Sequence, residues 1–430
     1  MSSSSSSAMR RGMPWLVVAG VLVAAISLRG PIVAPTPVLS DIEADLDVGS
    51  VAAGLLTSAP VLMFAMLTPL AALVIRRAGA ELALLLSLCG VLVGTFVRAL
   101  PGFGWMLAGM FVIGAFITIG NVVIPVVIRR DVPPERVAFV TAMYAATLNV
   151  GSLVTSLGTA PLAGLIGWHA ALMAWSVLTV VGIALWAVHM RTSRGTDDGL
   201  SGLQPSPGTR DAASRETAGG VDAATITGPM PVVGAARSTR SIVRRPVSWL
   251  LVAAFGLQCT IYYGLTTWLP TIATDELGLS PTAAGAVASI FQGAGIAGAF
   301  VVPVLARFAP RWVAPVVICA SWLAVTVGLI VAPEWLWGWL AIGAIGHAGG
   351  FVVIFSTLVA VTRSDREAAG LSALVQGAGY SIGALGGPAM GALHEATGGW
   401  SLALVVMLAC AVAYCAALAG AVFTSARGAR

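Results

Sequence analysis

The chain has 430 residues, of which 58% are hydrophobic and 10% are charged, and it carries a formal net charge of +5. Soluble domains carry about 25% charged residues, so this composition, with a mean hydropathy of +0.93, excludes a soluble protein and predicts one embedded in lipid. The Arg residues that supply the positive charge are spread over many loops, which argues against a nucleic-acid partner.

Apolar stretches long enough to cross a membrane recur along the whole chain. A transmembrane helix needs roughly 20 mostly apolar residues, and the first half contains six such stretches, at 13–38, 50–75, 81–100, 104–128, 136–166 and 168–190. The second half contains six more, at 247–273, 282–306, 312–332, 335–362, 367–394 and 400–424. We therefore predict an all-α membrane protein with twelve transmembrane helices.

Charged residues indicate how these helices are oriented. The loops on one side carry the Arg residues: Arg10, Arg11, Arg76, Arg77, Arg129, Arg130, Arg136, the cluster from Arg191 to Arg245, Arg307, Arg311, Arg363, Arg366, Arg427 and Arg430. The loops on the other side carry acids and almost no Arg: Asp41, Glu43, Asp45, Asp47, Asp275, Glu276, Glu334 and Glu395. Because Lys and Arg are enriched in cytoplasmic loops, we expect both termini in the cytoplasm and the protein in a bacterial inner membrane.

The chain divides into two similar halves joined by a polar linker that lacks an apolar period. Ala52-Ala53-Gly54 after the first span corresponds to Ala283-Ala284-Gly285 after the seventh, at an offset of 231 residues (285 − 54). This repeat predicts two pseudo-symmetric six-helix bundles with a binding site between them at mid-membrane. The predicted divisions are 1–12, a disordered cytoplasmic N-terminus; 13–190 and 247–424, the two bundles; 191–246, a cytoplasmic linker; and 425–430, a cytoplasmic tail.

Arg29 lies inside the first predicted span, where a guanidinium stays charged and is costly to bury without a partner. No Asp or Glu lies near the middle of any predicted span, so the sequence offers no evident internal counter-ion. One interpretation is that a small anionic substrate supplies the missing charge. The other is that Arg29, followed by Pro31, Pro35 and Pro37, caps the carbonyls of a broken helix or reaches the outer interface. Arg98, near the outer end of the third span, is also expected to reach that interface.

Other polar side chains within the spans are candidates for the same site. Gln258 and Tyr262 are four residues apart and share a helix face, as do Gln376 and Tyr380, so each pair would offer neutral partners to a small solute. Hydrogen bonding between helices explains these residues equally well. His347 is interpreted either as a carrier of a proton or as a structural histidine.

The sequence offers no catalytic, metal or cofactor site. A phosphate-binding loop of the Walker type requires Lys, and the chain has none. The five Cys residues fall within predicted spans without the spacing of metal ligands, and we interpret them as packing residues. An intramembrane enzyme would need acids, His or Cys clustered at one depth, which the sequence does not provide. Secondary transport remains as the expected function.

A series of short motifs runs along nearly the whole chain outside the linker. The first half contains Leu28-Arg29-Gly30-Pro31, the string from Gly120 to Pro125 with Arg130-Asp131, and Tyr144 with Leu148-Asn149. The second half contains Gly256-Leu257-Gln258 with Tyr263, Trp268-Leu269-Pro270, Leu371-Ser372-Ala373 with Gln376-Gly377, Gly379-Tyr380 and Gly398-Gly399-Trp400. In their order, these motifs resemble the cyanate and nitroimidazole transporter family of the major facilitator superfamily.

The resemblance implies the major facilitator fold and the transport of cyanate, other small anions or planar nitrogen compounds. The candidate substrate-binding residues, including Gln376 from its shared helix face, are Arg29, Asn121, Tyr144, Asn149, Gln258, Tyr262, His347 and Gln376. Two features depart from the family pattern. His347 stands where Gln is frequent, and the loop after the second span reads Arg76-Arg77-Ala78-Gly79-Ala80-Glu81 in place of Asp-Arg-x-Gly-Arg. The candidate gating residues on the cytoplasmic side are Arg76, Arg77, Arg307 and Arg311.

The predicted function is secondary transport of a small, anionic solute by alternating access, in a monomer embedded in the lipid bilayer. Either the solute or His347 would carry a coupled proton, or transport would be uncoupled. The nearer alternative is a drug or metabolite exporter of the same fold, which the apolar and aromatic content of the spans suits equally well. The more distant alternative is a membrane receptor or an intramembrane enzyme, but a receptor would need a sizeable folded domain outside the membrane.

Overall fold

The structure is a computed structural model that describes residues 15–197, 242–310, 312–362 and 365–428. Every regular element in these ranges is a helix, which confirms the predicted all-α class. The predicted N-terminal segment 1–12 and most of the predicted linker 191–246 lie outside the described residues, as do Arg311 and the last two residues of the predicted tail.

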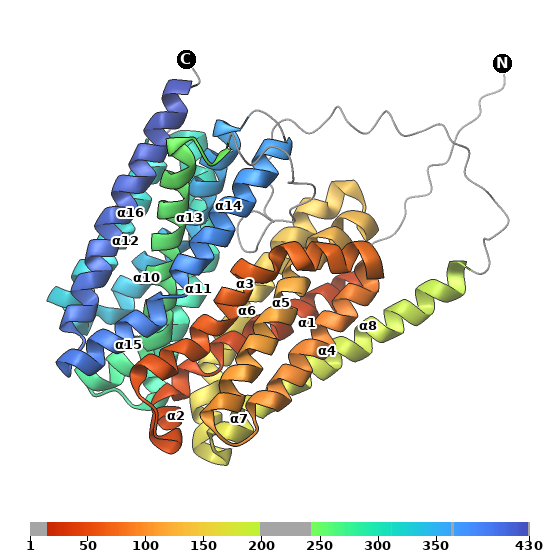
Figure 1. Cartoon of the computed structure of the whole chain (residues 1–430), viewed down its shortest axis with the longest axis horizontal. Helices are drawn as coiled ribbons and strands as arrows, with labels where there is room; N and C mark the ends of the chain where they lie inside the picture. Colours follow the sequence, from red (N-terminus) through yellow and green to blue (C-terminus); the bar gives the residue numbers. More distant parts are fainter. Residues whose placement is uncertain (1–14, 198–241, 311, 363–364, 429–430) are drawn as a thin grey trace.

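The helices form two groups that follow one another in the sequence. The first group is α1 (Trp15–Val33), η1 (Thr36–Val38), α2 (Leu39–Leu46), α3 (Ser50–Ala78), α4 (Ala80–Arg98), α5 (Phe103–Asp131), α6 (Pro134–Ile166), α7 (Trp168–Ala174) and α8 (Ser176–Asp197). The second group is α10 (Pro246–Leu277), α11 (Pro281–Phe308), α12 (Val313–Val331), η3 (Pro333–Trp335), α13 (Leu336–Val361), α14 (Asp365–Gly383), α15 (Gly386–Thr397) and α16 (Ser401–Gly428). Figure 1 shows them as two neighbouring bundles, red to yellow-green and green to blue.

Ten segments of the described chain are long and apolar enough to cross a membrane. The two remaining predicted spans, 282–306 and 367–394, coincide with α11 and with the broken pair α14 and α15. The sixth, ninth and twelfth predicted spans bury only 28%, 44% and 39% of their most apolar windows, whereas α10 buries 72%. These three spans are therefore the most exposed to lipid along their apolar windows.

Exposed Trp side chains mark two levels along the bundles. Near one end of the helices are Trp15, Trp249 and Trp312, and near the other end are Trp105, Trp335 and Trp337, all at least 50% exposed. Trp is enriched at both membrane–water interfaces, so the two levels match the borders of a bilayer. The first level is called the basic end here because Arg77, Arg129 and Arg307 lie beside it, and the second is called the acidic end because Asp41, Asp275 and Glu395 lie beside it.

The two bundles approach each other most closely at the acidic end, where glycines lie on both sides. A Cβ on Gly54 of α3 would lie 2.7 Å from the carbonyl carbon of Gly387 in α15, so the two backbones touch without intervening side chains. One turn further along each helix, Gly391 packs directly on the backbone of Ser50. The absence of side chains at positions 54, 387 and 391 is therefore what allows this end to close.

Two hydrogen bonds between the bundles reinforce this contact. The hydroxyls of Thr57 in α3 and Thr267 in α10 are 2.7 Å apart and buried. At the start of α3, the backbone N–H of Val51 donates to Oε1 of Glu395 in α15 at 2.9 Å. A carboxylate at a helix N-terminus interacts favourably with the free N–H groups and the helix dipole. The acidic end is thus closed by contacts that must break if the bundles separate there.

Candidate functional site

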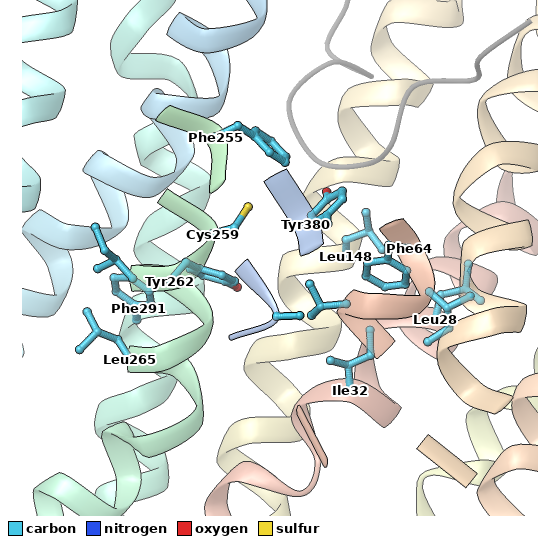
Figure 2. Packing of buried hydrophobic residues seen from close by; sticks show 14 of the residues in the cluster. Leu28, Ile32, Phe64, Leu148, Phe255, Cys259, Tyr262, Leu265, Phe291 and Tyr380 are labelled. Carbon is cyan, nitrogen blue, oxygen red and sulfur yellow. The ribbon is translucent and has the colours of Figure 1, made fainter. Parts of the chain in front are cut away.

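A cavity of about 50 Å³ lies between the bundles, near the middle of α6, α10, α11 and α13. One water molecule needs roughly 10–15 Å³ of such volume, so the space suits a solute of a few heavy atoms. Its lining consists of Arg29, Leu148, Asn149, Tyr262, Tyr263, Phe291, Gln292, Gly295, His347, Ala348, Phe351 and Tyr380. Figure 2 shows Tyr262 of α10 and Leu148 of α6 on opposite sides of the interface, with the Tyr262 hydroxyl directed toward the first bundle.

Arg29 of α1 connects the two bundles through this cavity. Its Nη2 donates to the hydroxyl of Tyr262 at 3.4 Å, across 233 residues of sequence. The Tyr262 hydroxyl in turn donates to Oε1 of Gln292 at 3.0 Å. Charge-assisted hydrogen bonds are normally about 2.7–2.9 Å long, so the tyrosine satisfies the guanidinium only weakly.

No carboxylate of the described residues lies within ion-pair distance of Arg29. The ion pairs seen among the described side chains join Arg130 to Glu81 and Asp131, and Arg245 to Glu367, all at the basic end. The polar side chains that line the cavity with Arg29 include no acid; they are Asn149, Tyr262, Tyr263, Gln292, His347 and Tyr380. The charge of the guanidinium is therefore available to a solute that binds in the cavity.

Aromatic rings form one wall of the cavity. The imidazole of His347 stacks on the ring of Tyr262 with centroids 3.6 Å apart and planes only 7° apart. Phe291 stacks against the same tyrosine at 5.6 Å, and Phe351 meets His347 edge-on at 5.1 Å. Stacked rings present flat faces, so the wall suits a planar or linear solute.

Gln258 and Gln376 do not line the cavity, although each lies one helical turn before a tyrosine that does. Gln258 is fully buried between α10 and α13, where its Nε2 donates to the carbonyl of His347 at 3.2 Å. It fits there because Gly350 has no side chain to occupy the space. Gln376 donates to Ser372 within α14 at 2.7 Å. The amide nitrogens of both residues are thus bonded inside the second bundle, away from the cavity.

Of the other predicted residues, Asn149 lines the cavity from α6, whereas Asn121 and Tyr144 are buried in the first bundle outside the lining. The sequence analysis assigned no role to Gln292 or Tyr263. Both are visible in the sequence as polar side chains inside apolar spans, and this signal could have added them to the candidates.

The candidate gating residues lie at the basic end. Arg77 and Arg307 are exposed there, and the Arg307 guanidinium lies 5.4 Å from the ring of Phe308. Arg76 belongs to α3. The acidic partner at this end is Glu81, in the first turn of α4, which accepts from Arg130 of α5 at 2.8 Å. This pair lies within the first bundle, so no described ion pair joins the two bundles there.

The prediction that Arg98 reaches the membrane interface is wrong. The side chain is only 3% exposed, and its Nη1 and Nη2 donate to the carbonyls of Pro31 and Leu172 at 2.9 and 3.0 Å. These carbonyls lie where α1 and α7 end, and helix ends leave carbonyls without intrahelical partners. The carbonyl-capping role considered for Arg29 therefore belongs to Arg98.

Comparison with known proteins gives matches over nearly the whole chain. Residues 17–388 match the family described as Major Facilitator Superfamily. The chain is 29% identical over 393 residues to the 2-nitroimidazole transporter of Escherichia coli (strain K12), covering 91% of each protein. It is 25% identical over 383 residues to the cyanate transport protein CynX of the same strain, covering 87% of this chain and 89% of that protein.

A solved structure resembles the arrangement of both bundles. It is a bacterial homolog of the human lysosomal transporter Spinster in an inward-facing and occupied conformation, and it matches with a TM-score of 0.66 and 17% sequence identity over 96% of each chain. At that identity, the likeness bears on the fold alone.

Proposed function

The chain belongs to the Major Facilitator Superfamily, and we propose that it carries a small anionic solute across the membrane through the cavity at Arg29. The resemblance noted in the sequence motifs is confirmed, and the protein is a multi-pass membrane transporter rather than an enzyme. We propose both the chemical class of its solute and the mechanism of transport.

The observation that carries the proposal is a guanidinium in a cavity between the two bundles whose lining contains no Asp or Glu. A charge held in a low-dielectric site is costly unless an opposite charge compensates it. A bound anion would replace the long contact between Arg29 and Tyr262 with short, charge-assisted hydrogen bonds. Asn149 and Gln292 line the same cavity and would complete the polar contacts.

We propose alternating access as the mechanism. The closed acidic end, joined by the contact of Gly54 with Gly387 and by the bond from Val51 to Glu395, supports a conformation in which the cavity communicates with the basic end. Enrichment of Arg at the basic end supports a cytoplasmic location for that end, in a bacterial inner membrane. Arg76, Arg77 and Arg307 would then act at the cytoplasmic gate.

Two classes of substrate fit different features of the cavity. A linear triatomic anion such as cyanate, which the name of one relative mentions, suits the small volume and the free charge. A planar nitroheterocycle, which the name of the other relative mentions, suits the stacked rings of His347, Tyr262 and Phe291. We favour the anion because only an anion compensates the charge of Arg29.

Transport measurements distinguish these classes. Protein reconstituted in liposomes is expected to take up radiolabelled cyanate with saturation, and unlabelled small anions are expected to compete. Uptake of labelled 2-nitroimidazole without any uptake of cyanate would replace the anion by a neutral ring as the substrate class. Export of larger apolar drugs, with neither of these transported, would support the exporter alternative.

His347 is proposed to carry the coupled proton. It lies beside Arg29 in the cavity, and an anion bound between them would reduce the repulsion between the guanidinium and an imidazolium. Uptake of the anion is therefore expected to increase as the external pH falls. In His347→Gln, uptake is expected to persist with a flat pH profile.

The matched control for this prediction is His169→Gln, because His169 is exposed at the start of α7. This control should keep the pH profile of the unsubstituted protein. An unchanged profile in His347→Gln would exclude His347 as the proton carrier and leave the solute itself to carry the proton.

A further inference from the structure

Two prolines break the first helix just after Arg29, beyond Pro31, which lies inside α1. Pro35 and Pro37 have no N–H, so the carbonyls of Pro31 and Val33, four residues earlier, lose their helical donors. The hydroxyl of Thr36 donates to the carbonyl of Val33 at 2.9 Å. The carbonyl of Pro31 is left to a side chain from another helix, because a buried carbonyl without a partner is costly.

That side chain is Arg98, at the last position of α4. One end of its guanidinium donates to Pro31 of α1 and the other donates to Leu172 of α7. Gly109 of α5 packs against the backbone of Arg98, and any side chain at position 109 would collide with it. The backbone of Arg98 is thus held against α5, and the two donors of its guanidinium fix the break in α1 relative to α7.

We propose that Arg98 is a positioning residue for Arg29. The carbonyl that it holds belongs to Pro31, two positions after Arg29 on the same helix, so the break that Arg98 fixes also sets the direction of the Arg29 side chain. This inference rests on the proposed anion site at Arg29. Misplacement of a binding group by about 1 Å can cost roughly 100-fold, so a fixed break would matter for affinity.

The chemistry of Arg98 explains why this position carries Arg. A guanidinium is a planar fork whose N–H groups point in fixed directions, so it reaches two carbonyls on different helices at once. A Lys ammonium carries its donors on one nitrogen atom. It would donate to one of the two carbonyls, of Pro31 or of Leu172, and leave the other without a partner. The contacts of Arg98 are carbonyl oxygens and the sulfur of Met110, and no described carboxylate forms an ion pair with it.

The test combines two readouts of position. The first uses Arg29→Cys and measures its rate of labelling by a small methanethiosulfonate reagent, with the labelling of the parent protein's own cysteines subtracted. Adding Arg98→Met to this variant is expected to change the rate at least about fivefold, because the thiol no longer faces the cavity in the same way. Ser87→Ala is the matched control, because Ser87 also lies on α4 but its hydroxyl donates to a carbonyl of α5, that of Phe116, and not to one of α1.

The second readout is the binding of potassium cyanate, measured by calorimetry. Arg98→Met is expected to weaken binding roughly tenfold or more, and Arg98→Lys is expected to weaken it less. In the double variant with Arg29→Gln, the substitution at position 98 should cause no further loss, because residues that act through one another are not additive. Arg98→Lys keeps the buried charge and serves if Arg98→Met does not fold.

The outcomes separate this inference from the proposed function. An unchanged labelling rate in both Arg98 variants, or fully additive losses of cyanate binding, would overturn the positioning role. Unchanged cyanate binding in Arg29→Gln would overturn the anion site instead, and the labelling experiment would still report whether Arg98 orients position 29.

Discussion

Arg29→Gln is expected to abolish saturable uptake of a small anion while leaving the protein folded. The glutamine keeps a polar side chain, although a shorter one, and removes the permanent charge. A hydrogen bond to a charged group contributes about 1.5–3 kcal/mol, so loss of a bidentate pair should raise the apparent KM at least about 100-fold. The measurement is uptake of labelled cyanate into proteoliposomes, together with the thermal shift that the anion produces.

Two further substitutions sharpen this result. Arg29→Lys keeps the charge but not the planar fork and should give an intermediate KM. Arg191→Gln removes an exposed Arg from α8 and should leave uptake unchanged, which controls for the loss of one positive charge. If Arg29→Gln transported cyanate with the KM of the unsubstituted protein, the guanidinium could not be the anion site.

Gly54→Val is expected to stop transport by keeping the bundles apart at the acidic end. A Cβ at this position would lie 2.7 Å from the carbonyl carbon and 2.8 Å from the oxygen of Gly387. These are backbone atoms, which cannot rotate out of the way as the atoms of a side chain can. Overpacking typically costs about 1–3 kcal/mol, and a cost of that size shifts a two-state equilibrium by roughly 5- to 150-fold.

We therefore expect the maximal rate of uptake to fall about tenfold or more in Gly54→Val, with a smaller change in KM. Gly104→Val is the matched control, because Gly104 also lies on a helix but has open space beside it. Thermal unfolding of both variants shows whether the bundles themselves stay intact. Full transport in Gly54→Val would mean that closure at the acidic end does not require the contact between positions 54 and 387.

The sequence was sufficient to predict where the helices lie, because each span must satisfy its own backbone hydrogen bonds in lipid and must therefore be long and apolar. The predicted spans 50–75 and 104–128, for example, lie within α3 and α5. Arg29 could be singled out for the same reason, since a charge within an apolar span is costly wherever the helix packs.

The sequence could not decide which polar side chains face the cavity, because that depends on the helix packed against each one. Gln258 and Tyr262 share a helix face by spacing, yet Gln258 turns toward α13, where Gly350 leaves room for it. Gln292 lines the cavity and accepts from Tyr262. The spacing of residues within one helix does not show which helices pack against it. An amide can form hydrogen bonds both in a cavity and between packed helices.

Arg98 shows the same limit for a charged residue. Its place near a helix end predicts that it reaches the membrane interface, because a long side chain can extend its charge to water from there. The tertiary structure instead brings the carbonyls of Pro31 and Leu172 to it from two other helices. Composition and period determined the membrane fold and the cost of each intramembrane charge. Only the packing of the helices decided which groups compensate each charge, since packing alone sets the distances between residues that are remote in sequence.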